Sequence, residues 1–415
     1  MRWLDALFGN LICQGSIRVI DHAGRRKDYG DGSPPAAVLR FTDSATEARC
    51  FLAPHYHLLD AYTEGTLLVE DGSFHAFLDI CAANIARQGW SPLARAHRAL
   101  GRAFLAWEAY NPIHLSHQRI ARHYDLKEDL FRLFLDEDMQ YSCGYFPTPD
   151  TPLEAAQSAK KRHIAAKLDI RDGQRVLDIG CGWGGLALSL ARMADVEVVG
   201  ITLSAEQLEV ARRRAASAGL ADRVRFELVD YRQLAGCFDR IVSVGMFEHV
   251  GPPHYRTFFR RVNELLADDG VALLHSIGET DKGGGHPWIR KHIFPGSYTP
   301  ALSQVLPHVE RAGLMTTDVE ILRLHYAYTL RAWRQHFLAN RAQAAEMYDE
   351  RFCRMWEAYL AACEVGFTRL SLMVFQLQMA KDRNALPITR DYMIERERQS
   401  PLPRRDRQKV EAGRD

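Results

Sequence analysis

The chain has no Cys-x-x-Cys pair, although it contains eight cysteines among 415 residues. Zinc ribbons and thiol–disulfide oxidoreductases depend on such pairs, so we expect neither a metal site nor a redox motif. No stretch approaches the roughly 18 consecutive apolar residues that a membrane-spanning helix needs. Neither sign of charge dominates, because 53 Lys and Arg residues balance 52 Asp and Glu residues. A net charge of +1 gives no global field that would attract nucleic acid.

What remains is the composition of an ordinary soluble protein, with 47% hydrophobic and 25% charged residues. A chain of this length predicts one large domain or two. The opening segment, residues 1–12, is short and contains Asp5, so we interpret it as an amphipathic helix and not as a signal peptide. Together with the unpaired cysteines, it predicts a cytoplasmic protein whose thiols stay reduced.

The most informative segment is residues 175–185, which has the pattern of a buried strand, a glycine loop and the start of a helix. Such a loop lets the backbone approach a nucleotide held against a helix N-terminus. Its glycine spacing also fits the dinucleotide fingerprint, but an NAD site needs an acidic residue at the tip of the second strand. That position holds Thr202, whereas Asp178 suits a ligand amine or hydroxyl. Residues 177–184 resemble motif I of S-adenosylmethionine-dependent methyltransferases, which favours that cofactor over NAD.

Strand-like and helix-like segments alternate from residue 175 onward. The predicted strands are 175–179, 196–201, 224–229, 238–244 and 271–277. The predicted helices between them are 185–193, 204–217 and 255–266. This alternation predicts an α/β fold with a doubly wound, Rossmann-like parallel sheet that binds its ligand at the carboxyl ends of the strands.

We divide the chain at Asn111-Pro112 into a small N-terminal α+β domain and a larger catalytic domain. The three predicted parts are residues 1–111, the catalytic domain 112–395 and a charged, proline-containing tail 396–415 that we expect to be disordered. Residues 15–70 are expected to be rich in β-strand. An aromatic, glycine-rich insertion after Gly278 leads to helices between 299 and 366, and a last strand at 372–378 is expected at the edge of the sheet.

Polar residues follow several predicted strands, where a doubly wound fold places its site. Asp230 suits an adenine amine, but aspartate is also a common helix cap. Glu248 and His249 suit proton chemistry or a polar ligand, yet an adjacent pair of this kind is also found in ordinary turns. His275 interrupts an apolar strand, and a lone buried histidine is more often structural. It is expected at the same edge of the sheet as Glu248, which leaves the functional and the structural interpretation equally open.

Seven stretches together resemble the cyclopropane-fatty-acid synthase family, which includes the mycolic-acid cyclopropane and methyl synthases. They are residues 140–146, 177–184, 200–207, 246–251, 274–278, 289–296 and 325–330. The first 110 residues look similar to the small N-terminal domain of the phospholipid-acting branch of this family. The resemblance implies a class I methyltransferase domain with a helical and aromatic insertion.

The resemblance also implies the residues that hold S-adenosylmethionine. Tyr141 and Ser142 would line its methionine end. Gln207 would take the place of the usual ribose-binding acid. The remaining cofactor positions are Asp178, Gly180, Cys181, Gly182, Gly184, Thr202, Leu203, Ser204, Asp230, Tyr231 and Arg232.

A bicarbonate ion acts as general base in this family, and its ligands map to matching residues here. They are the side chains of Glu248, His275 and Tyr326 and the backbone N–H groups of Cys143 and Ile277. Cys363 matches a cysteine that has been nominated as catalytic. The reaction needs no sulfur nucleophile, so we favour a packing role for that thiol.

The implied reaction is methylene transfer to the cis double bond of unsaturated phospholipid acyl chains. Methyl transfer leaves a carbocation, which aromatic faces such as Tyr326 and Phe247 would stabilise. A base then removes a proton from the added methyl group, and the ring closes. The alternatives are a relative that leaves a methyl or methylene branch, a non-catalytic lipid-binding relative and a small-molecule methyltransferase.

The lipid substrate implies peripheral association with the inner face of a membrane, and the family resemblance suggests a homodimer. Docking is expected through the N-terminal helix with Arg25-Arg26-Lys27 or with Lys160-Lys161-Arg162. Such basic clusters are more often solvated faces. Aromatic residues of the insertion, including Trp288 and Trp333, are candidates for an acyl tunnel or for ordinary core.

Overall fold

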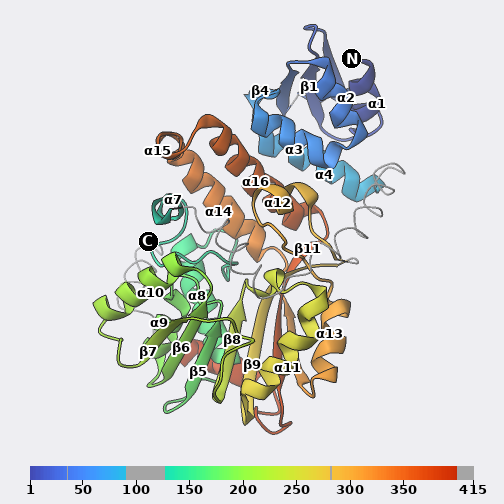
Figure 1. Ribbon diagram of the computed structural model, residues 1–415. Coiled ribbons are helices and arrows are strands. Elements are labelled where there is room, and N and C mark those ends of the chain that lie inside the picture. Colours follow the sequence, from blue (N-terminus) through green and yellow to red (C-terminus); the bar gives the residue numbers. More distant parts are fainter. Residues whose placement is uncertain (35, 90–126, 281–282, 400–415) are drawn as a thin grey trace. The chain divides into compact units, whose positions relative to one another are not determined.

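The structure is a computed structural model that describes residues 1–34, 36–89, 127–280 and 283–399 (Figure 1). The chain divides into two compact units. The first unit is drawn from the segments Met1–Trp107, Gly285–Pro295 and Leu330–Leu372. The second is drawn from Glu108–Gly284, Gly296–Thr329 and Met373–Asp415. No helix in the described part of the chain is long and apolar enough to cross a membrane.

The second unit contains a seven-stranded sheet with strand order β10-β11-β9-β8-β5-β6-β7. Its strands are β5 (Arg175–Ile179), β6 (Glu197–Thr202), β7 (Val224–Leu228), β8 (Phe238–Val244), β9 (Leu266–Glu279), β10 (Met315–Ile321) and β11 (Leu372–Ala380). The strands from β9 to β7 pair in parallel, and β10 pairs with β11 in antiparallel fashion. The predicted doubly wound α/β class is confirmed.

Helices cover this sheet because successive residues of its strands point to two different apolar cores. Val176 and Val198 belong to one core, whereas Leu177 and Val199 belong to the other. The first core includes residues of α8 (Leu153–Lys167), α9 (Gly185–Met193) and α10 (Ala205–Ser217). The second includes residues of α11 (Tyr255–Leu265) and α13 (Leu302–Arg311). Strands buried on both faces explain the continuous apolar runs in the sequence.

One part of the prediction for this unit is wrong. The segment from 299 to 366 was expected to be helical, yet β10 lies within it and forms the edge of the sheet. The strand 372–378, expected at the edge, is β11 and lies between β9 and β10. The β10 sequence contains Thr316, Thr317 and Val319, which favour a strand, but its charged residues hide the pattern.

The first unit holds a four-stranded sheet with strand order β2-β1-β3-β4. Its strands are β1 (Ser16–Ile20), β2 (Arg26–Gly30), β3 (Ala37–Phe41) and β4 (Leu67–Gly72). Its helices are α1 (Arg2–Phe8), α2 (Ser44–Leu52), α3 (Pro54–Glu64), α4 (Phe74–Gln88), α12 (Pro287–His292), α15 (Arg341–Met347) and α16 (Glu350–Arg369). Helices α2 and α3 lie within the region 15–70 that was expected to be rich in strand, so that expectation holds only in part. The helix α14 (His325–Ala339) contributes residues to both units.

Helix α16 groups with the N-terminal helices, although the sequence placed it in the catalytic domain. The Glu364 carboxylate lies 3.3 Å from His75 of α4 and 2.8 Å from Arg334. The Tyr62 hydroxyl of α3 donates to Glu357 at 2.6 Å. The contacts of α16 with His75 and Tyr62 join residues that are almost 300 positions apart, which local sequence patterns do not reveal.

The predicted boundary at residue 111 and residues 400–415 lie outside the described part of the chain. Within that part, α17 (Asp391–Gln399) continues as a helix past residue 396, where the disordered tail was expected to begin. Arg396 donates to Asp169 at 3.0 Å, and Glu397 lies 3.1 Å from His163. The disordered tail was therefore predicted to begin too early. Residues 396 and 397 are ordered because they form ion pairs with α8 and with the turn that follows it.

Two glycines with the same positive φ allow a matched test of packing around the loop. Gly184 and Gly173 both have φ 82°, but a Cβ on Gly184 would lie 2.7 Å from Phe226, whereas a Cβ on Gly173 would meet nothing within 4 Å. Gly173→Ala should cost about 1 kcal/mol of stability through backbone strain alone. Gly184→Ala should cost about 1–3 kcal/mol more through overpacking. Thermal unfolding by calorimetry measures both, and equal effects would contradict the packing argument.

Candidate active site

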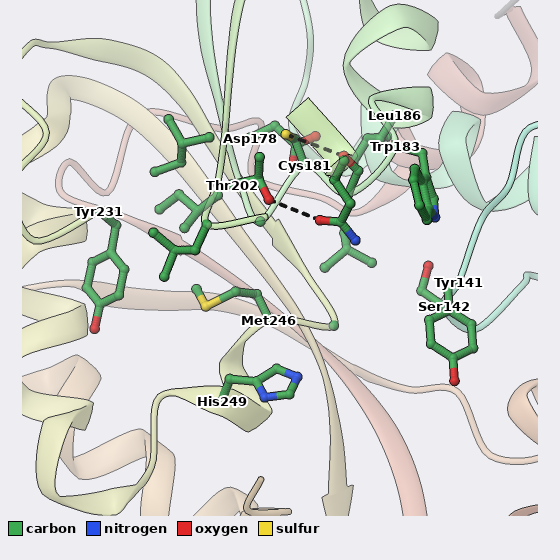
Figure 2. Close-up of a pocket in the computed structure, with 18 of the residues that line it drawn as sticks. Tyr141, Ser142, Asp178, Cys181, Trp183, Leu186, Thr202, Tyr231, Met246 and His249 are labelled. Atoms are coloured by element: carbon green, nitrogen blue, oxygen red, sulfur yellow. Dashed lines mark hydrogen bonds between the residues drawn. The ribbon is translucent and has the colours of Figure 1, made fainter. Parts of the chain in front are cut away.

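A pocket opens at the carboxyl ends of β5, β6 and β8, where the two-sided packing of the sheet ends (Figure 2). In Figure 2, Tyr231 lies at one end and Tyr141 and Ser142 lie at the other, with Asp178 and Cys181 between them. The side chains of Met246 and His249 lie on the opposite side of the cavity from Asp178. An elongated pocket of this kind suits a ligand with chemically different ends.

The glycine loop lies against the end of the neighbouring strand. The N–H groups of Gly180 and Cys181 both donate to the Ile201 carbonyl of β6, each at 2.9 Å. The N–H of Gly184 donates to the Cys181 carbonyl at 2.9 Å, which turns the chain into α9. These bonds fix the loop so that its backbone lines the pocket wall.

The tip of β6 presents neutral polar groups where a dinucleotide site would need an acid. The Thr202 hydroxyl donates to the Gln207 side-chain carbonyl at 3.0 Å. The Ser204 side chain caps α10 by accepting from the Gln207 N–H at 3.3 Å. Because the Gln207 carbonyl is occupied by Thr202, the amide NH2 is the end available as a donor to a ligand hydroxyl.

The end of β7 carries a tight ion pair. Arg232 donates to both oxygens of Asp230, at 2.8 Å from Nε and 2.6 Å from Nη2. Asp230 also accepts from the Arg232 N–H at 2.9 Å. The sequence assigned Asp230 to an adenine amine, and the structure adds that this carboxylate also holds the arginine beside it.

Asp178 of β5 has a strongly perturbed carboxyl group. Burial raises the pKa of Asp178 to about 7. Its Oδ2 atom is buried and has no hydrogen-bond partner among the described residues. A buried acceptor without a donor costs free energy, so this position fits a ligand that brings an N–H or O–H group.

Glu248, in the turn after β8, is a second carboxyl of this kind. Burial raises the pKa of Glu248 to about 7. Its Oε1 accepts from the Ile277 N–H at 2.6 Å, and its Oε2 is buried without a partner in the described part of the chain. The Ile277 N–H, expected to bind bicarbonate, is therefore donated to Glu248 in this structure.

His275 of β9 is held by a residue that sequence reasoning missed. The Gln376 amide of β11 donates to His275 Nδ1 at 3.1 Å, so the ring proton sits on Nε2. Burial lowers the pKa of His275 to about 3, which keeps the imidazole neutral. At neutral pH this side chain is a hydrogen-bond donor through Nε2 and not a base.

Cys143 and Tyr326 lie on segments that are joined by hydrogen bonds. The Gly144 N–H donates to the Thr329 hydroxyl of α14 at 2.9 Å, and the Phe146 N–H donates to His325 Nδ1 at 2.8 Å. Burial raises the pKa of the Cys143 thiol, so only its backbone is suited to bind an anion. Tyr326 follows His325 and is 8% exposed.

The pocket collects most of the cofactor positions that the sequence predicted. They are Tyr141, Ser142, Asp178, Gly180, Cys181, Gly182, Thr202, Leu203, Gln207, Asp230, Tyr231 and Arg232. Gly184 and Ser204 do not line it and act as the loop and helix supports described above. None of the predicted base residues lines the pocket, but Glu248 and Cys143 directly adjoin the lining residues His249 and Ser142 in the sequence.

Three roles that the sequence left open, a catalytic one for Cys363 among them, find no support in the packing. Cys363 belongs to α16 in the first unit, and burial raises the pKa of its thiol to about 12, so it is not a thiolate at neutral pH. Phe247 is fully buried and stacks on Tyr255 with ring centroids 4.5 Å apart. Trp288 and Trp333, considered for an acyl tunnel, are also fully buried in the first unit.

Lys160, Met246 and His249 line the pocket without having been predicted as cofactor residues. For His249, the adjacent Glu-His pair was a usable signal. Lys160 gave none, because it stands in the basic cluster 160–162 that was considered for membrane docking. The structure corrects that interpretation for Lys160, whose side chain is 1% exposed.

Comparison with known proteins places this architecture in one family. The model of the mycolic acid cyclopropane synthetase family matches residues 114–377. Cyclopropane-fatty-acyl-phospholipid synthase of Escherichia coli K12 is 46% identical over 271 residues, covering 65% of this chain and 69% of that protein. A probable fatty acid methyltransferase of Pseudomonas putida is 39% identical over 288 residues, covering 66% and 73%. The crystal structure of mycolic acid cyclopropane synthase CmaA1 with SAH and CTAB is 34% identical, with a TM-score of 0.61, and matches over 65% of this chain and 99% of CmaA1.

The raised pKa of Glu248 predicts a pH-dependent effect on stability. Its pKa is about 7 in the fold against an ordinary value of 4.5, so the free energy of unfolding decreases as the pH rises through this window. Glu248→Gln keeps an acceptor for Ile277 but cannot ionise. The Tm of the variant relative to the parent should therefore rise between pH 5 and pH 8, by the equivalent of about 3 kcal/mol. Thermal unfolding at both pH values measures this, and a pH-independent difference would contradict it.

Proposed function

The chain belongs to the mycolic acid cyclopropane synthetase family of S-adenosylmethionine-dependent methyltransferases, and we propose that it converts cis double bonds of unsaturated phospholipid acyl chains into cyclopropane rings. The observation that carries the proposal is the buried carboxyl of Glu248, which accepts from the Ile277 N–H and directly precedes His249 of the pocket lining. The relative that is 46% identical bears the name of this activity, and the relative crystallised with SAH also holds CTAB, an alkyl-chain molecule.

The pocket fits S-adenosylmethionine in the chemistry of its donors and acceptors. The unpartnered Oδ2 of Asp178 suits the α-amine, and the Gln207 amide suits a ribose hydroxyl. Asp230, Tyr231 and Arg232 would lie at the adenine. When bound, the cofactor supplies an electrophilic methyl group on a sulfonium. The residues of the chain bind and orient it and keep water from the reacting atoms.

An alkene is a weak nucleophile, and the attack on a methyl group leaves positive charge on the acyl chain. We propose that the aromatic face of Tyr326 stabilises this charge, since the attraction of such a face for a desolvated cation is about 2 kcal/mol. Phe247, which packs inside the core, is not retained for this role. The neutral His275 adds no positive charge that would oppose the cation.

Proton loss from the added methyl group needs a base. We propose that His275 through Nε2–H, the Tyr326 hydroxyl, Glu248 and the N–H groups of Cys143 and Ile277 hold a bicarbonate ion. The ion would supply a base that is small enough to reach the acyl chain. Glu248, with its pKa near 7, exchanges a proton at neutral pH, and its unpartnered Oε2 is the atom that does so.

The proposal includes peripheral binding at the cytoplasmic face of a membrane and a homodimer. Trp3 of α1 is 44% exposed and lies near Phe51, with ring centroids 5.2 Å apart. Leu52 is 55% exposed. Lys27, which belongs to the basic cluster 25–27, donates to Asp5 at 2.6 Å, so part of that cluster's charge is neutralised. Apolar contacts are therefore favoured over basic ones as the source of membrane affinity.

The structure of the product distinguishes ring formation from the alternative, a branched acyl chain. This alternative is tested because one relative, 39% identical, is named a probable fatty acid methyltransferase. Purified protein is incubated with labelled S-adenosylmethionine and vesicles of unsaturated phospholipid, and the fatty acids are analysed by mass spectrometry. Ring formation adds one CH2 and removes the double bond's reactivity. A methylene branch adds the same mass but stays reactive. No labelling of lipid, with or without bicarbonate, would refute the proposed function.

Glu248→Gln should lower turnover by about 100-fold or more while the affinity for S-adenosylhomocysteine stays within about twofold, because the carboxyl serves proton transfer and not cofactor binding. Depleting bicarbonate should lower turnover of the parent protein and leave that affinity unchanged. Initial rates and calorimetric titration measure the two effects. A fully active variant would remove Glu248 from the mechanism.

A further inference from the structure

Lys160 of α8 is a buried cation inside the cofactor pocket. Its side chain is 1% exposed, and it lines the cavity together with Ser142 and Asp178. Its Nζ atom donates to the Gln140 side-chain carbonyl at 2.8 Å and to the Ser142 hydroxyl at 2.7 Å. Both acceptors are neutral, so the charge is solvated but not compensated by them.

No carboxylate of the described chain forms an ion pair with Lys160 within 4.0 Å. Asp136, the nearby acid that most favours the charged lysine, instead accepts from the backbone N–H groups of Asp138 and Gln140, at 3.2 and 2.8 Å. Burying an unpaired ammonium is costly. A lysine has three N–H donors, and the two bonds to Gln140 and Ser142 leave one for a ligand.

Asp178 is the complementary group of the same pocket. Its Oδ2 lacks a donor, and no ion pair joins its carboxyl to Lys160 in the described part of the chain. The pocket thus offers an acceptor for a cation and a donor for an anion that do not form an ion pair with each other. An α-amino acid group, with an ammonium and a carboxylate on one carbon, matches this pair of charges.

We propose that Lys160 binds the carboxylate at the amino-acid end of the cofactor, directly through its third N–H and through the Ser142 hydroxyl that it holds, while Asp178 binds the α-amine. The assignment rests on the proposed function, because it presupposes S-adenosylmethionine as cofactor. It makes Lys160 a cofactor-binding residue and gives the buried cation a direct ionic partner, which the described chain does not provide.

Two other roles for Lys160 are distinguishable by experiment. The ammonium contributes to the low pKa of His275, so one alternative is that it acts on the anion proposed beside His275. It also ties α8 to the segment of Gln140 and Ser142, which is a structural role. Only the proposed role depends on whether the ligand carries a carboxylate.

The test is calorimetric titration of the full chain with two ligands and without turnover. S-adenosylhomocysteine carries the amino-acid group, whereas 5′-methylthioadenosine shares its adenosine and sulfur but lacks that group. Lys160→Met should weaken binding of S-adenosylhomocysteine by about tenfold to a hundredfold and leave 5′-methylthioadenosine within about twofold. Lys161→Met is the matched control, since Lys161 is the next residue of α8, pairs with Asp138 at 2.6 Å and does not line the pocket. It should leave the ratio of the two affinities unchanged.

An unchanged ratio in Lys160→Met would overturn the assignment, as would an equal loss of both ligands, which indicates a structural role. A changed bicarbonate dependence of turnover without loss of S-adenosylhomocysteine binding would assign Lys160 to the anion proposed beside His275 instead. If Lys160→Met does not fold, the parent protein still decides, because it must bind S-adenosylhomocysteine more tightly than its decarboxylated analogue. A parent protein that binds no S-adenosylhomocysteine would refute the proposed function itself. Equal affinity of the parent for S-adenosylhomocysteine and for its decarboxylated analogue would refute this assignment alone.

Discussion

Burial of ionisable groups at the carboxyl edge of the seven-stranded sheet is the constraint on which the site depends. Asp178, Glu248 and His275 are all nearly inaccessible to solvent. Desolvation disfavours the charged form of each group, so the pKa values of the two carboxyls rise to about 7 and that of the imidazole falls to about 3. At neutral pH the carboxyls are poised to exchange protons, while the imidazole is fixed as a neutral donor.

The two-sided packing of the sheet produces this burial. Asp178 alternates with Leu177 and Ile179, which belong to the core that includes α11 and α13. Successive side chains of a strand point to opposite faces, so Asp178 points away from that core. The same reasoning applies to His275, which follows Leu274, and to Gln376, which lies between Phe375 and Leu377. Leu274, Phe375 and Leu377 all belong to that core, so His275 and Gln376 point away from it. The polar groups therefore gather on one face, where α8 also places Lys160.

Local sequence patterns were sufficient to predict much of the fold and much of the cofactor site. Strand β5, the glycine loop and α9 were predictable because apolar runs, glycines and helix periodicity are encoded within a few residues. Gln376 was overlooked although it interrupts an apolar strand, because its partner His275 lies about 100 residues earlier. Lys160 was misinterpreted because its burial is decided by Gln140 and Ser142, which precede it by about 20 residues in a segment without regular structure. Tertiary contacts of this kind, and the grouping of α16 with α4, have no local signature.

The bond between Glu248 and Ile277 links ion binding to protonation in the proposed mechanism. The Ile277 N–H stabilises the charged carboxyl of Glu248 and so lowers its pKa against the effect of burial. An anion that takes this N–H removes that stabilisation and adds a like charge nearby. Both changes raise the pKa of Glu248, so the carboxyl takes up a proton as the anion binds. The protonated Glu248 then donates a hydrogen bond to the anion that has replaced it as acceptor of the Ile277 N–H. This explains how a carboxyl group and an anionic base can lie side by side in one site.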